Sequence, residues 1–243
     1  MALAGSLLFW AFMLVTSVFL FPIALLIRAV TSPFDRRLAF LHLFSCFWAS
    51  LYTWCNPLWS VRIDGKEHVE KHATYVIVCN HQSLLDILVL FRLFVHFKWV
   101  SKAENFRIPF VGWNMTLNRY IRIERGRTRG NLSMMRDAET TLKAGSSVMI
   151  FPEGTRSPGG RPGEFKPGAF ELALRSGLPI LPIAINGTAA ALPRRGFRLR
   201  GKHAIRVRVL DPISPPWAPG ADAGALGAMA HARIAEEVAG ELA

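Results

Sequence analysis

Apolar and polar positions divide the chain near residue 60. Residues 2–27 form an uncharged run rich in Leu, Phe and Val. As a helix this run is long enough to span or enter a bilayer, which takes about 20 apolar residues. A short basic loop follows at residues 28–37, and residues 38–59 form a second apolar and aromatic run without formal charge. The pattern predicts an N-terminal membrane-associated helical hairpin over residues 1–58 and a separate domain over residues 59–243.

The charges predict how this hairpin lies in a membrane. The positive-inside rule places the 28–37 loop on the cytoplasmic side, and the basic domain after Arg62 should also be cytoplasmic. A second run that spans the membrane fully would put the loop and the domain on opposite sides, so the two placements exclude a full span. We therefore expect the second helix to lie in the interface or to re-enter, with Trp48, Trp54 and Trp59 at headgroup depth. The first helix either spans once or sinks into one leaflet. The expected location is a membrane with the active site on the cytoplasmic side, which in a bacterium is the inner membrane.

After residue 60 the pattern changes to short strands that alternate with helices. Strands are predicted at residues 60–64, 74–79, 98–101, 120–124, 147–151, 180–186 and 203–209. Helices are predicted at residues 83–95, 131–143, 168–177 and 222–243. Pro182 should place its strand at a bulge or an edge. The alternation predicts one α/β domain, with a roughly seven-stranded, mostly parallel or mixed sheet flanked by helices.

Charge and cysteine content narrow the class of protein. The net charge of +12, the 51% hydrophobic content and the positive mean hydropathy indicate an anionic partner and a membrane. Residues 1–60 contribute only +2 of that charge, so the basic character belongs to the domain. Cys46, Cys55 and Cys79 have no metal-binding spacing, and we expect reduced, buried thiols.

The turn from Asn80 to Asp86 lies between a predicted buried strand and a predicted helix. Ser83 and Asp86 form a capping-box pattern, which predicts that the helix begins at Ser83. His81 then lies between strand end and helix start, where open α/β sheets bind their ligands. If Asp86 reaches the imidazole, the pair makes a general base. The alternative is that Asp86 only caps the helix and His81 is only a polar turn residue.

A second polar turn, residues 151–157, also begins at a strand end. Gly154 allows a ligand to approach the backbone closely, and turn amides can face an anion. Arg156 can make a two-pronged contact with phosphate. The alternative is a polar loop held by a Glu153–Arg156 ion pair. Two such turns at two strand ends favour a binding site.

Two basic regions, residues 98–129 and 194–208, add an electrostatic signal. Next to a membrane such cations attract anionic lipid, at about 1 kcal/mol per cation. Nucleic acid is the rival partner. The absence of a recognisable nucleic-acid motif, and of regular aromatic interleaving, argues against it.

These motifs resemble the signature blocks of the glycerolipid acyltransferase family. Asn80–Asp86 resembles the first block, Ile121–Arg125 the second, Phe151–Ser157 the third and Leu178–Ile183 the fourth. Glu124 departs from the aspartate that is more frequent in the family, and Lys102-Ala103-Glu104 resembles a Lys-x-Glu segment. The resemblance covers about residues 59–210. Gln82 and Thr155 fit the branch that acylates lysophosphatidic acid.

The resemblance implies a membrane-bound enzyme that transfers a fatty acyl group from acyl-CoA or acyl-ACP to the sn-2 hydroxyl of lysophosphatidic acid, giving phosphatidic acid. It implies His81 as general base, oriented by Asp86, with amides near Gly154 stabilising the oxyanion. The implied substrate- and phosphate-binding residues are Lys102, Arg125, Glu153, Gly154, Thr155 and Arg156. It implies no metal and no cofactor. The expected partners are lysophospholipid, acyl thioester and membrane lipid, with acyl carrier protein as an alternative donor and no nucleic acid.

Two other readings stay open on the sequence alone. The chain could acylate another lysolipid, such as a lyso-ornithine lipid or lysocardiolipin. It could also be a membrane lipid-binding protein that keeps the fold without turnover. Ser83 is interpreted as a helix cap and not as a nucleophile, because the acceptor lipid supplies the attacking hydroxyl.

Overall fold

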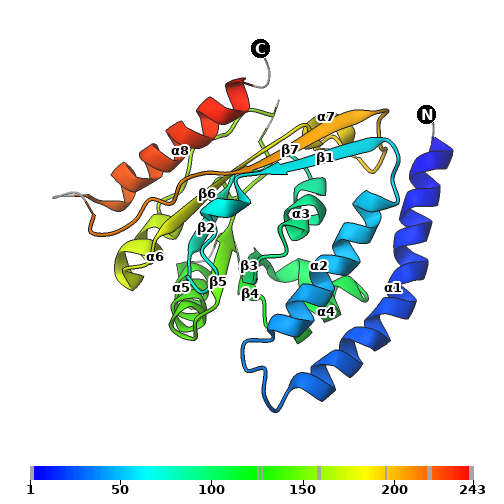
Figure 1. Cartoon of the computed structure of the whole chain (residues 1–243), viewed down its shortest axis with the longest axis horizontal. Coiled ribbons are helices and arrows are strands. Elements are labelled where there is room, and N and C mark those ends of the chain that lie inside the picture. Colours follow the sequence, from blue (N-terminus) through cyan, green and yellow to red (C-terminus); the bar gives the residue numbers. More distant parts are fainter. Residues whose placement is uncertain are drawn as a thin grey trace.

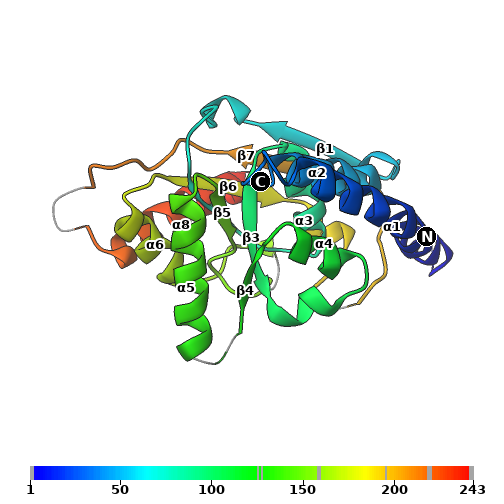
Figure 2. The same ribbon diagram turned by 90° about the horizontal axis from the view of Figure 1, so that it is seen from below.

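The computed structural model describes residues 3–124, 126, 128–157, 160–194, 196–217 and 221–240. Within them a seven-stranded sheet separates two layers of helices (Figures 1 and 2). The strand order is β1-β7-β6-β2-β5-β3-β4. The strands are β1 Trp59–Asp64, β2 Val76–Cys79, β3 Phe97–Lys102, β4 Ile121–Ile123, β5 Ser147–Ile150, β6 Ile180–Asn186 and β7 His203–Val209. The predicted α/β class and strand number are confirmed.

The direction of the strands decides where the loops meet. Strands β6, β2, β5, β3 and β4 are parallel to their neighbours in that order. β7 is antiparallel to β6, and β1 is parallel to β7. The carboxyl ends of the five co-directional strands therefore lie at one edge of the sheet, where open α/β folds place their ligands.

The two helical layers bury alternate residues of each strand. On one face lie α1 (Leu3–Thr31), α2 (Ala39–Trp54), α3 (Leu85–Leu90) and α4 (Val111–Leu117); on the other lie α5 (Thr128–Lys143), α6 (Gly168–Ser176) and α8 (Ala223–Gly240) (Figure 2). Ile77 and Cys79 of β2 face the first layer, whereas Val76 and Val78 face the second. The short elements are η1 (Lys66–His68), η2 (Phe91–Leu93), η3 (Ala103–Arg107) and α7 (Thr188–Ala191).

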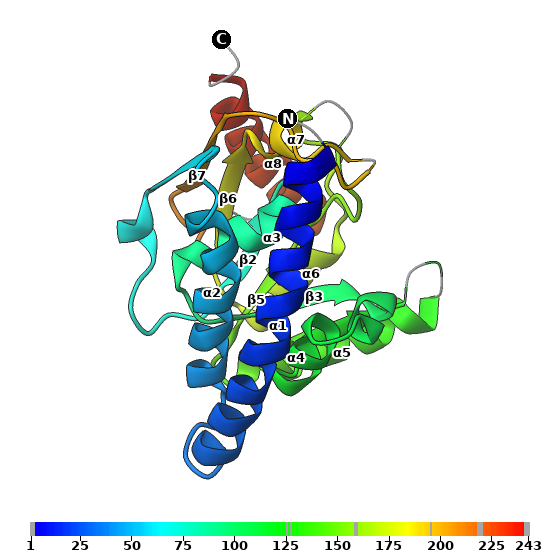
Figure 3. The same cartoon turned by 90° about the vertical axis from the view of Figure 1, so that its right-hand side faces the viewer.

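The first two helices run side by side in opposite directions (Figures 1 and 3). Among the described helices, α1 is the one whose length and composition would allow it to cross a membrane, and only 11% of its apolar window is buried. α2 is instead built into the domain, with Leu41, His42 and Cys46 fully buried. The role of the pair in membrane attachment stays a prediction.

The structure corrects the predicted position of the tryptophans. Trp48 and Trp59 are buried within the protein, so they are not available to lipid headgroups. Trp48 donates its indole N–H to the Tyr52 hydroxyl at 2.6 Å, and Trp59 packs edge-on against Phe9 of α1. Trp54 alone of the three is largely exposed, at 48%.

Two predicted element positions also change. Helix α5 begins at Thr128, three residues before the predicted start at Asn131. Strand β6 is central and pairs on both sides, although it contains Pro182. The Pro182 carbonyl accepts a hydrogen bond from Leu210 N at 3.0 Å, so the nitrogen of Pro182 faces the same side. The pairing register shifts by one residue beside Pro182, from Ile183↔Val209 to the isolated bridge Ile180↔Ile213. Pro182 therefore lies at a bulge, as one of the two predicted alternatives has it, and not at an edge.

Candidate active site

Asn80 lets the chain leave the sheet without breaking it. Its side-chain Nδ2 donates to the carbonyl of Ile185 at 2.9 Å, and its Oδ1 accepts from the amide of the same residue at 2.9 Å. The side chain thus takes the place of a backbone partner for β6. The next residue, His81, is therefore held at the carboxyl end of β2 while the backbone turns away.

His81 and Asp86 form the predicted pair. The imidazole Nδ1 lies 2.7 Å from Asp86 Oδ2, and Asp86 is fully buried whereas the His81 side chain is 14% exposed. The imidazole ring stacks on Phe151, with centroids 4.0 Å apart and planes 11° apart. The carboxylate and the stacked ring together fix the plane of the imidazole.

Asp86 is surrounded by hydrogen-bond donors. Its Oδ2 also accepts from the amides of Gln82 at 2.6 Å and Ser83 at 2.8 Å, and its Oδ1 accepts from the hydroxyl of Thr188. An ionised carboxylate is an acceptor only, which suits four donors. Nδ1 of His81 therefore carries the proton, and the lone pair lies on Nε2. Nε2 has no hydrogen-bond partner among the residues that the structure describes.

Ser83 acts as the predicted cap, although the helix begins later than expected. α3 begins at Leu85, two residues after the predicted start. One hydrogen bond of the capping box is formed, since Asp86 accepts from Ser83 N at 2.8 Å. Ser83 Oγ accepts instead from Leu85 N at 3.2 Å, and the amide of Asp86 donates to the Ser83 carbonyl. Ser83 is fully buried and donates its hydroxyl to the carbonyl of Leu192 at 2.6 Å. A hydroxyl held in this way is positioned to support the turn.

Thr188 is a site residue that the sequence reasoning missed. It begins α7 directly after β6 and is fully buried, with its hydroxyl on Asp86 and 3.3 Å from Gln82 Oε1. Gly187 before it has φ +86°, and a Cβ there would lie 2.1 Å from the carbonyl oxygen of Ala204. The one available signal was a polar Asn-Gly-Thr sequence at a strand end.

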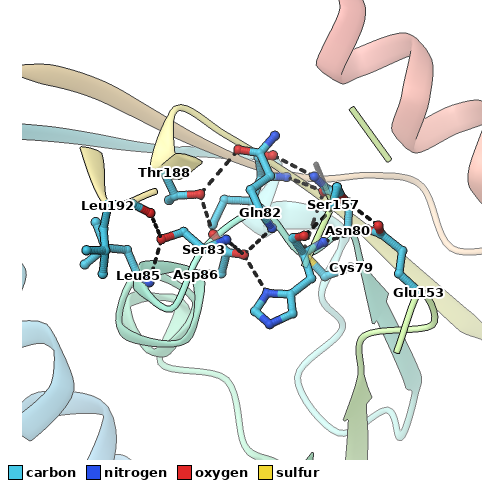
Figure 4. A network of polar contacts seen from close by, with 12 residues as sticks. Cys79, Asn80, Gln82, Ser83, Leu85, Asp86, Glu153, Ser157, Thr188 and Leu192 are labelled. Atoms are coloured by element: carbon cyan, nitrogen blue, oxygen red, sulfur yellow. Dashed lines mark hydrogen bonds and ion pairs between the residues drawn. The ribbon is translucent and has the colours of Figure 1, made fainter. Parts of the chain in front are cut away.

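Glu153 joins the two turns. This side chain is only 5% exposed. Its Oε1 accepts from the amide of His81 at 2.8 Å, and its Oε2 accepts from Ser157 Oγ at 2.5 Å and from Gly163 N at 2.9 Å. Ser157 N also donates to the carbonyl of His81 at 2.7 Å. Figure 4 shows Asp86 with Thr188 and Ser83 on one side of this network, and Glu153 with Ser157 on the other.

The second turn differs from both sequence interpretations in detail. The suggested Glu153–Arg156 ion pair is not among the salt bridges of the described residues, because Glu153 is directed inward to backbone and hydroxyl donors. Gly154 has φ +68°, which explains why glycine stands there, but its amide donates to the carbonyl of Phe151 at 3.0 Å. That amide is therefore engaged. The amides of Thr155 and Arg156 have no hydrogen-bond acceptor within the described part of the chain.

The remaining predicted residues lie at the same edge or outside the described residues. Lys102 ends β3, is exposed, and pairs with Ile123 of β4, beyond the end of β5. Strand spacing places β3 about 10 Å from β2, with β5 between them. Arg125 lies outside the described residues. Arg156 is half-buried, and its side chain has no hydrogen-bond or ion-pair partner among the described residues.

The two carboxylates affect the thiol beneath them. Burial, followed by the charges of Asp86 and Glu153, raises the pKa of Cys79 well above its usual value. The thiol therefore stays protonated and is not a nucleophile of this site. Within the described ranges, no three His, Cys, Asp or Glu side chains form a set that could hold a metal ion.

A cavity lies elsewhere on the domain. Its volume is about 340 Å³, and η3, α4, β4 and α5 contribute its lining, including Phe106 and Arg122. None of its lining residues belongs to the His81 or Glu153 turns. The hydrogen-bonded turns, and not this cavity, are therefore the candidate active site.

Comparison with known proteins shows the family of the chain. The family model described as acyltransferase matches residues 60–186. A chloroplast 1-acyl-sn-glycerol-3-phosphate acyltransferase of Arabidopsis thaliana is 35% identical over 207 residues, covering 85% of this chain and 56% of that protein. A protein of the same name from Saccharomyces cerevisiae is 33% identical over 159 residues, covering 63% of this chain and 52% of that protein. The chain thus spans about half the length of these curated relatives.

A solved structure shares the fold over nearly the whole chain. The crystal structure of the 1-acyl-sn-glycerophosphate acyltransferase of Thermotoga maritima has a TM-score of 0.73 and 23% identity, and the match covers 95% of this chain and 98% of that one. The family model covers more than half of this chain and includes both turns of the candidate site. The chain therefore belongs to the acyltransferase family.

Proposed function

We propose that this protein transfers a fatty acyl group from an acyl thioester to the sn-2 hydroxyl of lysophosphatidic acid, giving phosphatidic acid. The observation that carries the proposal is the His81–Asp86 pair at the carboxyl edge of the sheet, with a proton on Nδ1 and an Nε2 that no described residue hydrogen-bonds. The names of the relatives support the choice of acceptor.

His81 Nε2 removes the proton from the acceptor hydroxyl as that oxygen attacks the thioester carbonyl. The carbon–oxygen bond forms, and the carbonyl oxygen takes up negative charge in the tetrahedral intermediate. The carbon–sulfur bond then breaks, and the leaving thiolate takes the proton back from the imidazolium. Asp86 stabilises the imidazolium between these steps while it keeps its own four hydrogen bonds.

The second turn supplies the electrostatic part of the mechanism. The Gly154 amide is engaged, so the amides of Thr155 and Arg156 are the backbone donors left for the oxyanion. The guanidinium of Arg156, which pairs with no other described residue, suits the acceptor phosphate, and Lys102 and Arg125 have the charge for the same role. Glu153 contributes by positioning, because it fixes the backbone of His81.

Membrane attachment through the N-terminal helices fits this substrate. Leu8, Phe19 and Leu26 of α1 are each more than 60% exposed, which is unusual for large apolar side chains on a protein surface. Phe21 of α1 packs against Trp113, which is itself 45% exposed. An apolar face that continues from α1 onto the start of α4 would rest in the leaflet that supplies the acceptor. Because the positive-inside rule puts the basic 28–37 loop on the cytoplasmic side, we place this surface on the cytoplasmic leaflet.

One assay tests the function. Lysophosphatidic acid and either acyl-CoA or acyl-ACP are added to the purified protein in detergent micelles, and the rate of phosphatidic acid formation is measured. We expect His81→Ala and Asp86→Ala to lower kcat by about 10²–10⁴, the usual contribution of a general base. Wild-type rates in both variants would rule out the base assignment.

Competing acceptors separate the alternatives. A preference for lyso-ornithine lipid or lysocardiolipin over lysophosphatidic acid would change the acceptor and remove Arg156 from a phosphate role. Lipid binding without acyl transfer to any acceptor would favour a non-catalytic lipid-binding protein.

A further inference from the structure

Two segments far apart in the sequence pack against the Glu153–Arg156 turn, and each brings a cation. The first is residues 163–166. Gly163 N donates to Glu153 Oε2 at 2.9 Å, and Lys166 N donates to the carbonyl of Pro152 at 3.0 Å. These bonds fix the backbone of the segment relative to the turn.

The fixed backbone lays the Lys166 side chain across Gly154. The position that a Cβ on Gly154 would occupy is 3.1 Å from Lys166 Nζ and 3.4 Å from Cε. The ammonium group is therefore held over the turn at its glycine. Any larger residue at Gly154 would displace this cation, in addition to straining a backbone with φ +68°.

The second segment follows α7. The carbonyl of Leu192 accepts from Ser83 Oγ at 2.6 Å, which ties this segment to the His81 turn. Two residues on, Arg194 Nη2 donates to Thr155 Oγ1 at 3.2 Å. The guanidinium thus reaches the same turn from the other segment.

The charges at this turn are not neutralised within the described residues. The salt bridges there include none of Arg156, Lys166 or Arg194. The acid of the turn, Glu153, is directed away into the loop hydrogen bonds. Three cations therefore belong to or reach one turn, and together they favour a compact anion with several oxygens.

We propose that Lys166 and Arg194, together with Arg156, form a phosphate-binding cradle over the Gly154–Arg156 turn. Its ligand is a phosphate group carried by one of the two substrates: the phosphomonoester of the acceptor lipid or a phosphate of the acyl donor. The proposal deepens the proposed function and rests on it. Lys166 and Arg194 are substrate-binding residues, because they hold the substrate through the negative charge of its phosphate.

The test compares substrates with and without phosphate. Steady-state constants are measured for the wild type, Lys166→Ala and Arg194→Ala. The acceptors are lysophosphatidic acid and uncharged monoacylglycerol, and the donors are palmitoyl-CoA and palmitoyl-pantetheine. Each variant should raise KM about tenfold for the phosphate-bearing substrate that the cradle holds, with little change in kcat; tenfold corresponds to about 1.4 kcal/mol of binding.

The substrates that lack a phosphate show whether the cradle holds the acceptor or the donor. If the cradle holds the acceptor, the effect of the variants disappears with monoacylglycerol and persists with palmitoyl-pantetheine. If it holds the donor, the effect disappears with palmitoyl-pantetheine and persists with monoacylglycerol. An unchanged KM, or an equal loss with every substrate pair, overturns the cradle. Lys166→Arg and Arg194→Lys should restore part of the affinity.

Matched controls remove one charge outside the cradle. Arg198→Ala removes an exposed cation four residues beyond Arg194, and Lys143→Ala removes one at the end of α5, at the opposite edge of the sheet. Both should leave KM unchanged. A tenfold rise in either control would indicate a general surface effect and overturn the proposal.

A binding measurement separates this inference from the proposed function. Lysophosphatidic acid and CoA are each titrated into the full chain in detergent micelles by calorimetry. If the wild type forms no phosphatidic acid but binds one of these about tenfold more tightly than Lys166→Ala and Arg194→Ala do, the function fails and the cradle stands. If the wild type is active and all three proteins bind both ligands equally, the cradle fails and the function stands.

Discussion

Glu153 has two possible roles, to position His81 or to contact substrate, and a substitution of Glu153 distinguishes them because they predict opposite results. The carboxylate faces three donors, the amides of His81 and Gly163 and the hydroxyl of Ser157. In Glu153→Gln, an NH2 group replaces one oxygen, so it must face at least one of these donors. The substitution keeps shape and volume while it creates a donor–donor contact at a side chain that is only 5% exposed.

The cost follows from the lost interactions. A hydrogen bond to a charged group contributes about 1.5–3 kcal/mol, and a buried donor left without an acceptor costs about 1–3 kcal/mol. We therefore expect Glu153→Gln to lower the free energy of unfolding by about 3 kcal/mol. For a domain of this size, each kcal/mol lowers Tm by about 2–4 °C, so the expected decrease in Tm is about 6–12 °C.

Activity should fall with stability, mainly in kcat. Glu153 Oε1 holds the amide of His81, so loss of this bond shifts the catalytic imidazole and not a group that binds substrate. The assay combines thermal unfolding followed by circular dichroism with kcat and KM for lysophosphatidic acid. Glu164→Gln, at an exposed glutamate of the neighbouring segment, is the control and should change neither quantity.

The opposite result would refute this reasoning. If Glu153→Gln has a wild-type Tm and kcat but a raised KM, Glu153 contacts substrate directly, as its grouping with the binding residues suggested. A large decrease in Tm with unchanged kcat would show that the bond to His81 N does not position the imidazole.

Three further predictions follow from other parts of the molecule. Thr188→Val removes the hydroxyl that donates to Asp86, so kcat should fall about tenfold with little change in KM. Thr188→Ser keeps a hydroxyl and should keep wild-type kcat. Equal kcat in the two variants would contradict a role of Thr188 in orienting Asp86. Burial lowers the pKa of Lys98 to about 7. Between about pH 7 and pH 10 the unfolded chain therefore binds more protons than the folded one, and the free energy of unfolding rises with pH. Lys98→Met should remove this rise. The Tm of the wild type minus the Tm of the variant should therefore increase from pH 7 to pH 9.5. A Tm difference that stays constant over this range would mean that Lys98 stays charged in the folded protein. Replacing Leu8 and Leu26 of α1 by Asp should release the protein from lipid vesicles in a flotation assay without lowering Tm, because both side chains are exposed; vesicle binding at the wild-type level would place the attachment elsewhere.

The sequence by itself determined the features that depend on residues close together in the chain. Alternation and apolar runs gave the α/β class and the seven strands of the described sheet. The His81–Asp86 contact and the capping bonds of Ser83 join residues at most five positions apart, so the local spacing was enough to predict them. The same reasoning misplaced the start of α3 by two residues, because Ser83 and Leu84 form the turn that precedes the first helical residue, Leu85.

Only the tertiary structure decided what comes from distant segments. The Thr188–Asp86 bond joins residues 102 apart, and the bond from His81 N to Glu153 joins residues 72 apart. No periodicity encodes these pairs, because they depend on β6 and β5 lying on either side of β2. The same strand order keeps Pro182 in a central strand. Packing likewise buried Trp48 of α2 and Trp59 of β1, since an apolar residue suits a protein core as well as it suits lipid.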